Sequence, residues 1–319
     1  ARAQVRLSRP LAGGRITLIP YARTVELDFL RHFVPGAARE ANEHQSLGLL
    51  SSYRGKTKTA DYMFGVDAEL TRGRLSEFQD GPDRFSFVSG PHYDYRVDAI
   101  VLSAYGQSDI ALSNRLTLDI GARADWTRYS YETDLAPGLY GRFLVVPDRA
   151  DEFSIITPKA ALNYKLASAH SAYVRIARGA RAPQISDAYS LQRNQTPGEI
   201  KTEKLDALEA GVKGKIGAMD YALEAYAMRK ENFFFRDSSG FNVIDGKTRH
   251  KGIELSADGE ILPGLTLGGY ATWARHTYDF DRSNANPSNA ITRGDDVDTA
   301  PQFMARVSAD YHWADMFTL

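Results

Sequence analysis

The chain has 319 residues and nearly balanced charge, with 39 Lys and Arg against 40 Asp and Glu and a formal net charge of −1. This balance excludes a polybasic nucleic-acid binder and an acidic tail protein, so we expect no nucleic-acid partner. Cysteine is absent, which rules out a disulfide framework and thiolate metal sites.

Long apolar runs are missing from the sequence. No stretch approaches the roughly 18 to 20 consecutive apolar residues that a membrane-spanning helix needs. A spanning β-strand needs only about 9 to 11 residues with every second one apolar, which this composition permits. Residues 1–9 read as a strand and lack the basic start and apolar core of a signal peptide, so we interpret the chain as a mature or truncated product.

Alternation with period two is widespread and predicts strands with two different faces. Over residues 114–132 one set of positions is apolar, as at Leu118 and Ile120, and the other is charged or polar, as at Asp119 and Arg123. The same division recurs over residues 60–70, 251–261 and 302–311. These runs are long for a soluble sheet, whose strands usually have about 5 or 6 residues.

Connections between the runs alternate in length, as they do when every second one lies on the same side of a membrane. The expected short turns are 10–14, 56–59, 109–113, 167–170, 217–218 and 262–264, and the expected long loops are 30–42, 79–93, 133–152, 179–199 and 281–300. Only 237–240 is a brief member of the second set. We therefore predict short periplasmic turns and long outer loops.

About thirteen strands follow from this pattern, in an antiparallel all-β meander. Single-chain bacterial barrels close with an even number of strands, and an open sheet would leave backbone groups unsatisfied in lipid. We therefore expect a β-barrel domain over residues 1–319 that is truncated at both ends. A soluble β-sandwich is the alternative, but small residues such as Ala122, Ala124, Ala225 and Ala227 on the apolar face disfavour it.

Aromatic residues gather where the runs meet the loops, which is typical of the girdles that Tyr and Trp form at bilayer interfaces. The positions expected to form such girdles are Trp126, Tyr129, Tyr131, Phe233, Phe234, Phe235, Trp273, Tyr278, Phe280, Tyr311 and Trp313. Ordinary enrichment of aromatic residues in strands is the alternative explanation.

Several segments carry motifs of a known family. The segment Arg178-Gly179-Ala180-Arg181-Ala182-Pro183, with Asp187 and Tyr189 after it, resembles the R-G-x-R-A-P-x-x-x-E/D-x-Y segment of the TonB-dependent receptors of bacterial outer membranes. Residues 201–211 are similar to its K-P-E-x-x-x-x-x-E-x-G strand opening, with Thr202 in place of the common proline. Residues 252–254 look like its G-x-E strand, and 29–48 and 65–69 look like earlier hairpins.

The resemblance implies a 22-stranded transmembrane β-barrel filled by an N-terminal plug, of which this chain would supply the middle strands. The plug, the TonB box, and the first and last strands are then missing from residues 1–319. Coupling to the TonB protein, through that plug, is implied by the resemblance alone.

Catalytic signatures are absent from the sequence, so we expect no enzyme, no cofactor and no metal site. The seven histidines are scattered, and there is no H-E-x-x-H motif, nucleophile elbow or phosphate-binding glycine loop. The charged strand positions are expected to face a hydrated lumen or the plug: Asp61, Asp67, Glu69, Arg96, Asp98, Asp119, Arg123, Asp125, Lys159, Glu209, Lys213, Glu224, Glu254 and Asp258.

Ligand recognition is expected at the long-loop end, which meets a ligand first. Arg175, Arg178, Arg181 and Arg193, with Tyr189 nearby, could hold an anionic chelate through charge-assisted hydrogen bonds. The alternative is that Arg178 and Arg181 bind neighbouring carboxylates or lipopolysaccharide phosphates. A second candidate group is His92, Tyr93 and Tyr95, whose rings could stack on a planar ligand.

Together these features predict active nutrient uptake in the bacterial outer membrane, in contact with its lipid and lipopolysaccharide. A ferric siderophore is the favoured cargo because the resemblance implies it, and haem, cobalamin, other metal complexes and oligosaccharides remain open. A passive porin-like or adhesin-type barrel is the alternative. A soluble all-β binding module comes third.

Overall fold

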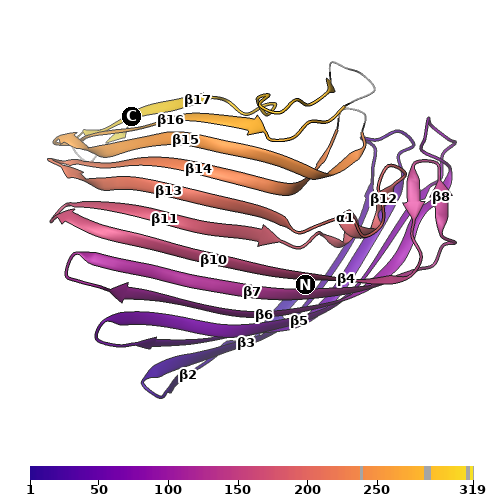
Figure 1. Ribbon diagram of the computed structural model, residues 1–319, viewed down its shortest axis with the longest axis horizontal. Helices are drawn as coiled ribbons and strands as arrows, with labels where there is room; N and C mark the ends of the chain where they lie inside the picture. The colour runs from indigo at the N-terminus through magenta and orange to yellow at the C-terminus, as the bar shows by residue number, and fades with distance from the viewer. Residues whose placement is uncertain (238–239, 284–288, 314–316, 319) are drawn as a thin grey trace.

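The computed structural model describes residues 1–237, 240–283, 289–313 and 317–318. Almost all of it is one fifteen-stranded antiparallel sheet (Figure 1). In chain order its strands are β1 (Arg2–Gln4), β2 (Leu7–Leu11), β3 (Gly14–Leu30), β4 (Arg39–Lys56), β5 (Ala60–Gln79), β6 (Gly90–Ala111), β7 (Leu116–Thr133), β10 (Arg149–Ala167), β11 (His170–Arg181), β13 (Glu203–Ile216), β14 (Met219–Arg236), β15 (Asn242–Leu262), β16 (Leu265–Tyr278), β17 (Phe303–Trp313) and β18 (Phe317–Thr318).

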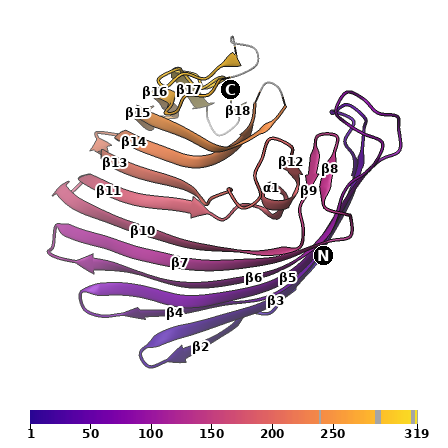
Figure 2. The same cartoon turned by 45° about the vertical axis from the view of Figure 1, so that its right-hand side comes forward.

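From β3 onward each strand of this sheet pairs with the next one along the chain, which confirms the predicted all-β meander. The strand expected at residues 1–9 is divided into β1 and β2, which both pair with β3. The sheet is strongly curved, like part of a barrel wall (Figures 1 and 2), and it does not close on itself within the described residues. No helix in the described part of the chain is long and apolar enough to cross a membrane.

Connections at the two ends of the strands differ in length, as predicted. One end has tight turns, such as residues 217–218 between β13 and β14, and the other has long excursions, such as residues 182–202 between β11 and β13. The expected loops 237–240 and 281–300 lie partly outside the described residues.

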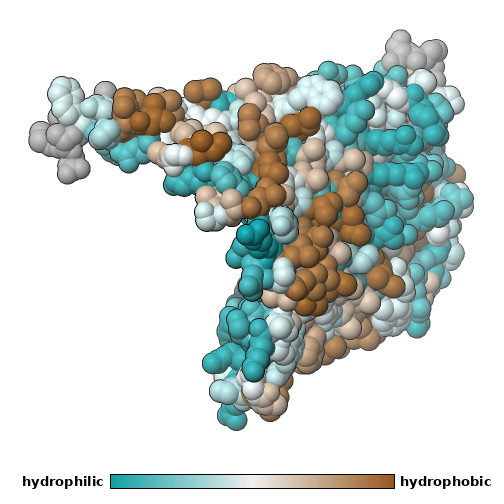
Figure 3. Space-filling view, turned by 60° about the vertical axis from the view of Figure 1, so that its left-hand side comes forward, coloured by the Kyte–Doolittle hydropathy of each residue, from teal (hydrophilic) through white to brown (hydrophobic). Residues whose placement is uncertain are grey.

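The two faces of the sheet differ as the alternation predicts. Large apolar side chains are exposed on one face, with Ile120 and Ile253 each 48% exposed and Val307 84% exposed. No element among the described residues covers them, and they form a hydrophobic band with hydrophilic regions on both sides (Figure 3). The opposite face carries charged and tyrosine side chains that hydrogen-bond one another, such as Arg123 with Asp67 and Tyr173 with Glu224. The apolar positions therefore do not form a shared dry core.

Glycines let polar side chains on this charged face reach across three strands. Tyr173 on β11, Gly211 on β13 and Glu224 on β14 lie in one row, and the tyrosine ring passes over the glycine so that its hydroxyl donates to the carboxylate. Tyr21, Gly48 and Glu69 repeat the arrangement on β3, β4 and β5. A third row is Gln107, Gly121 and Lys159, in which Lys159 Nζ donates to Gln107 Oε1 at 2.8 Å.

The long loops contain secondary structure that alternation did not predict. The segment between β7 and β10 forms the hairpin β8 (Gly138–Tyr140) and β9 (Phe143–Val145), and the segment after β11 forms α1 (Ile185–Tyr189) and β12 (Leu191–Gln192), which pairs with β9. We call β8, β9, α1 and β12 the loop cap. It packs on the loop end of β6 and β7, where it encloses the main buried core.

This core corrects part of the predicted girdle. Tyr129 and Tyr131 are only 9% and 2% exposed and belong to the core under the loop cap, because they occupy the charged-face positions of β7. By contrast, Trp273 and Trp313 are exposed, at 48% and 68%. Only some of the aromatic positions therefore lie on the apolar face.

Candidate functional site

Three arginines of β11 from the predicted ligand-binding group each lie opposite a carboxylate on β13. The register pairs Arg175 with Glu209, Arg178 with Asp206 and Arg181 with Glu203. The corresponding nitrogen–oxygen distances are 2.9, 2.6 and 3.0 Å. The neighbouring strand therefore supplies the partners of these guanidinium groups, in agreement with the carboxylate alternative for Arg178 and Arg181.

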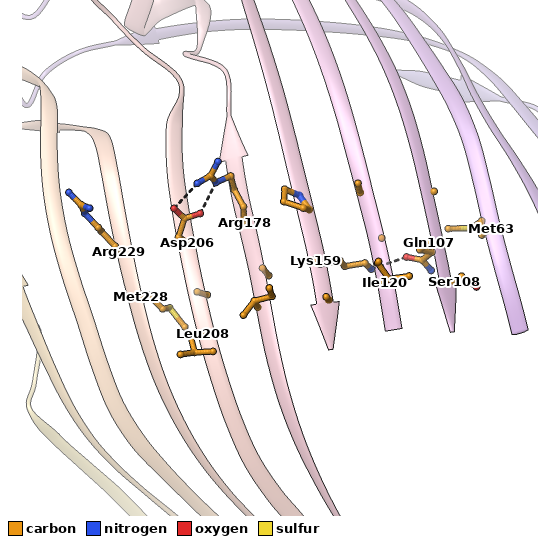
Figure 4. A pocket seen from close by; sticks show the side chains of 18 of the residues that line it. Met63, Gln107, Ser108, Ile120, Lys159, Arg178, Asp206, Leu208, Met228 and Arg229 are labelled. Carbon is orange, nitrogen blue, oxygen red and sulfur yellow. Dashed lines mark hydrogen bonds and ion pairs between the residues drawn. The ribbon is translucent and has the colours of Figure 1, made fainter. Parts of the chain in front are cut away.

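The structure does not bring the three arginines to one face. Successive side chains of a strand point to opposite faces, so Arg175 and Arg181 share the charged face while Arg178 lies on the apolar face. Figure 4 shows Arg178 and Asp206 facing each other from adjacent strands. Of these three arginines, only Arg175 and Arg181 can therefore line a site on the charged face.

The charged face holds a hollow of about 800 Å³ beside Arg175. Among its lining residues are Tyr173, Glu209 and Lys159, and Lys159 is hydrogen-bonded to Gln107, another lining residue. The Lys159–Gln107 bond is drawn in Figure 4. Donors and acceptors in this wall bind each other, as in the pairs Tyr173–Glu224 and Arg175–Glu209. Such a surface suits a hydrophilic passage.

His92, Tyr93 and Tyr95 lie inside the core under the loop cap. Their exposed fractions are 0%, 4% and 1%. The imidazole of His92 stacks on Phe143 at a centroid distance of 3.7 Å, and its Nδ1 lies 2.7 Å from Glu77 Oε1. A ligand could stack on these rings only if the loop cap moved away.

Tyr189 also belongs to this core and is completely buried. Its ring stacks on Tyr131 with centroids 4.5 Å apart, and its hydroxyl donates to Asp151 Oδ2 at 2.9 Å. This tyrosine of the motif therefore anchors α1 to the strands β7 and β10.

Arg193 is exposed and lies in a cluster that the loops assemble. Its guanidinium carbon is 5.3 Å from the Phe241 ring centroid, and that of Arg142 is 4.8 Å from the same ring and 4.7 Å from Phe87. Burial, followed by repulsion from Arg236 among the nearby charges, lowers the pKa of Arg142. We call Arg142, Arg193, Arg236 and Phe241 the loop arginine cluster.

A polar network fixes this cluster in place. Arg142 donates to the Gly240 carbonyl, and the Asn242 amide N–H donates to Gln192 Oε1 at 2.9 Å. Gln195 Oε1 accepts from both the Gln192 backbone N–H and Asn242 Nδ2, at 2.9 and 3.1 Å. The loop before β15 is thereby joined to the loop cap, and three loops act as one unit.

The sequence interpretation identified Arg193 but missed Arg142 and Arg236. Arg142 precedes β9 and lies 51 residues before Arg193, and Arg236 ends β14, so no local motif connects them. The loop-to-loop hydrogen bonds alone bring them together, and the sequence carries no signal for those.

Comparison with known proteins assigns the family. Residues 16–318 match the family described as TonB dependent receptor-like, beta-barrel. No curated protein sequence gives a match.

Solved structures agree with this assignment. The ferric yersiniabactin uptake receptor FyuA from Yersinia pestis has a TM-score of 0.71 and 17% identity, over 97% of this chain and 46% of that protein. The copper transporter OprC gives 0.76 and 15%, over 98% and 50%. The unliganded ferric citrate transporter FecA gives 0.73 and 14%, over 98% and 47%.

The chain spans about half the length of these solved relatives. At such low identity they share its fold and do not define its ligand. Because the family match covers nearly all of the sequence, and the curved antiparallel wall agrees with it, this chain belongs to the TonB-dependent receptor β-barrel family, whose members are transport receptors of the outer membrane.

Proposed function

We propose that this chain forms wall and outer loops of a TonB-energised outer-membrane receptor that takes up an anionic ferric chelate of the siderophore type. The observation that carries the proposal is the loop arginine cluster, in which Arg142 and Arg193 lie over the Phe241 ring and Arg236 is close enough to lower the pKa of Arg142. Grouped guanidinium groups bind carboxylates and other oxyanions through charge-assisted hydrogen bonds.

Two guanidinium groups of the cluster are open to a ligand. Arg193 and Arg236 are exposed and would make the contact. Arg142 is only 7% exposed and binds the Gly240 carbonyl, so it would support the cluster from within the loops. FyuA and FecA, by their names, handle ferric yersiniabactin and ferric citrate, which supports an iron chelate as cargo.

Below the loops, Arg175 and Arg181 would line the passage. Each is paired with a carboxylate, so the local net charge is close to zero. A passing anion could accept hydrogen bonds from these arginines without being bound tightly. We assign His92, Tyr93, Tyr95 and Tyr189 a supporting role under the loop cap, since all four are buried.

The exposed apolar band would face the acyl chains of the outer membrane. Arg178 lies on the same face at the loop end of β11, where it could meet lipopolysaccharide phosphates in addition to Asp206. Energy from TonB would reach the cargo through a plug domain, by analogy with the family.

Uptake of radioactive iron tests this function. Cells that lack the gene would be complemented with the full-length wild type, with the double variant Arg193→Ala and Arg236→Ala, or with Arg128→Ala as a control on the apolar face, where Arg128 pairs with Glu152. We expect TonB-dependent uptake of an anionic ferric chelate, a loss of tenfold or more in the double variant, and normal uptake in the control.

Two results would overturn the proposal. Equal uptake by cells with and without the gene, across a panel of ferric citrate, catecholate and hydroxamate complexes, would remove the iron assignment. Uptake that persists without TonB would instead identify a passive porin-like barrel.

A further inference from the structure

Two pairs of like charges lie on the outer part of the neighbouring strands β14, β15 and β16 (Figure 1). The register places Arg229 opposite Arg249 and Lys251 opposite Arg275, and all four side chains are exposed. Side chains at directly opposite positions project to the same face, with Cβ atoms about 4.5 to 5.5 Å apart, and like charges placed in this way are destabilising. We call these four residues the basic patch.

The basic patch borders the hydrophobic band. Lys251 and Ile253 are two residues apart on β15, and Arg275 and Trp273 are two residues apart on β16, so each pair shares a face. Ile253 and Trp273 are both 48% exposed and belong to the apolar face. Because β15 begins and β16 ends at the long-loop end, the two cations lie on the long-loop side of these apolar residues.

One buried carboxylate serves several guanidinium groups at this patch. Asp279 is 3% exposed and lies 2.9 Å from Arg249 and 3.7 Å from Arg229. It also pairs with Arg293, at 3.4 Å. Arg229 has one further partner, Glu231, at 3.0 Å. The repulsion between Arg229 and Arg249 is therefore only partly compensated.

The second pair is compensated even less. Arg275 lies 3.4 Å from Asp296, and both side chains are about half exposed. Lys251 has no ion pair within the part of the chain that the structure describes. The patch therefore carries more positive charge than its carboxylate partners neutralise.

Arginines on the outer part of β5 and β6 are compensated more fully. Arg72 lies directly opposite Asp98, at 2.8 Å. Arg74 and Arg96 do face each other, but both pair with Asp134, at 3.6 and 3.2 Å. The opposed cations of β14–β16 are thus a local feature of the wall.

We propose that the basic patch binds the phosphate groups of a lipopolysaccharide-type glycolipid in the outer leaflet. A phosphate between opposed cations replaces repulsion with attraction, since guanidinium groups bind it through paired hydrogen bonds and the ammonium group acts as a point charge. The acyl chains would lie along Ile253 and Trp273, which a free anion could not use. The inference rests on the proposed position of the wall in the outer membrane and assigns a lipid partner to these strands.

Binding of lipid A to the full-length receptor in detergent provides the test. Labelled lipid A would be titrated in EDTA, so that no divalent cation can bridge its phosphates to carboxylates. We expect at least tenfold weaker binding in the double variant Arg249→Gln and Lys251→Gln, and weaker binding of monophosphoryl lipid A to the wild type. Arg72→Gln is the matched control, because Arg72 is an exposed arginine with Asp98 opposite it.

Thermal stability gives a second readout, whose sign depends on the lipid. Without lipid, Lys251→Gln removes the repulsion with Arg275, so we expect it to raise the melting temperature of the barrel. With saturating lipid A, the wild type should gain more than the variant, because a ligand stabilises the state that binds it. A purely structural role of Lys251 would shift both conditions in the same direction.

Three results would overturn the lipid site. These are an affinity unchanged in the double variant, binding of phosphatidylglycerol as tight as that of lipid A, or displacement of lipid A by an equal concentration of inorganic phosphate. Heat-modifiable migration on gels would show that each variant barrel is intact. Lost lipid A binding in a wild-type receptor with normal iron uptake would contradict this inference alone, whereas lipid A binding without iron uptake would contradict only the proposed cargo.

Discussion

Arg178 and Asp206 form a two-bond ion pair on the apolar face, with Nε to Oδ1 at 2.6 Å and Nη2 to Oδ2 at 2.8 Å. The next motif arginine, Arg181, binds Glu203 on the opposite face. The arginines of one short motif therefore lie on both faces of the sheet, and the position of each arginine in the strand determines its face.

A double-mutant cycle on Arg178 and Asp206 measures the strength of this pair. Both side chains are about half exposed, at 40% and 52%, so we expect a coupling free energy of about 0.2 to 1 kcal/mol in refolding experiments with lipid vesicles. A coupling near zero in vesicles and in detergent would contradict a stabilising role. A much larger value would place the pair deep in the hydrocarbon.

Leu118→Asp and Asp119→Asn test the assignment of the two faces. Leu118 shares the apolar face with Ile120, where a carboxylate costs on the order of 2 kcal/mol, so we expect Leu118→Asp to block assembly into the outer membrane. Asp119 lies opposite Asp109, so its neutralisation removes a repulsion and should be tolerated. Heat-modifiable migration on gels reports assembly, and the reverse result would mean that the faces are exchanged.

Tyr189 should control the stability of the loop cap. Truncation by Tyr189→Ala removes a buried ring stacked on Tyr131, a change that typically costs about 3 to 5 kcal/mol. Tyr189→Phe removes only the hydrogen bond to Asp151 and should cost about 1 kcal/mol. Limited proteolysis of residues 182–202 should be fast in the first variant and slow in the second. Equal resistance in both would exclude the anchoring role.

Asp187 makes the loop cap sensitive to pH. Burial raises the pKa of its carboxyl group, against the opposing effects of the Gln184 N–H and Arg181. Its contribution to stability is therefore complete below the unfolded pKa of about 3.9 and is lost as pH rises through the higher folded value. We expect α1 in Asp187→Asn to exchange hydrogen more slowly than wild type at pH 7, with the difference shrinking toward pH 4. Measured at matched pH, a difference that grows on acidification would contradict this.

Strand identity and the two faces could be predicted because alternation is a local property. Asp119 and Ile120 follow from period two alone, and the structure places them as expected. The loop cap could not be predicted, since Phe143 and Leu191 become buried only when segments about fifty residues apart pair through β9 and β12. Tyr129 and Tyr131 were misassigned for the same reason.

The residues of the candidate site also differ in whether a local sequence pattern could predict them. Arg175 and Arg181 could be predicted because they lie close together in one strand, whereas Arg142 depends on a carbonyl supplied by Gly240, 98 residues away. The facing of Lys251 and Arg275 likewise requires the register of β15 and β16, which the sequence does not state.

Two hydrogen bonds each join a strand to its second neighbour, across a glycine of the strand between them. They are formed in the rows Tyr173–Gly211–Glu224 and Tyr21–Gly48–Glu69. A slip of one residue between adjacent strands would turn either partner to the other side of the wall and break the bond. These cross-strand hydrogen bonds oppose the sliding of one strand along its neighbour. A force applied along the strands would therefore be transmitted through the sheet without a change of register.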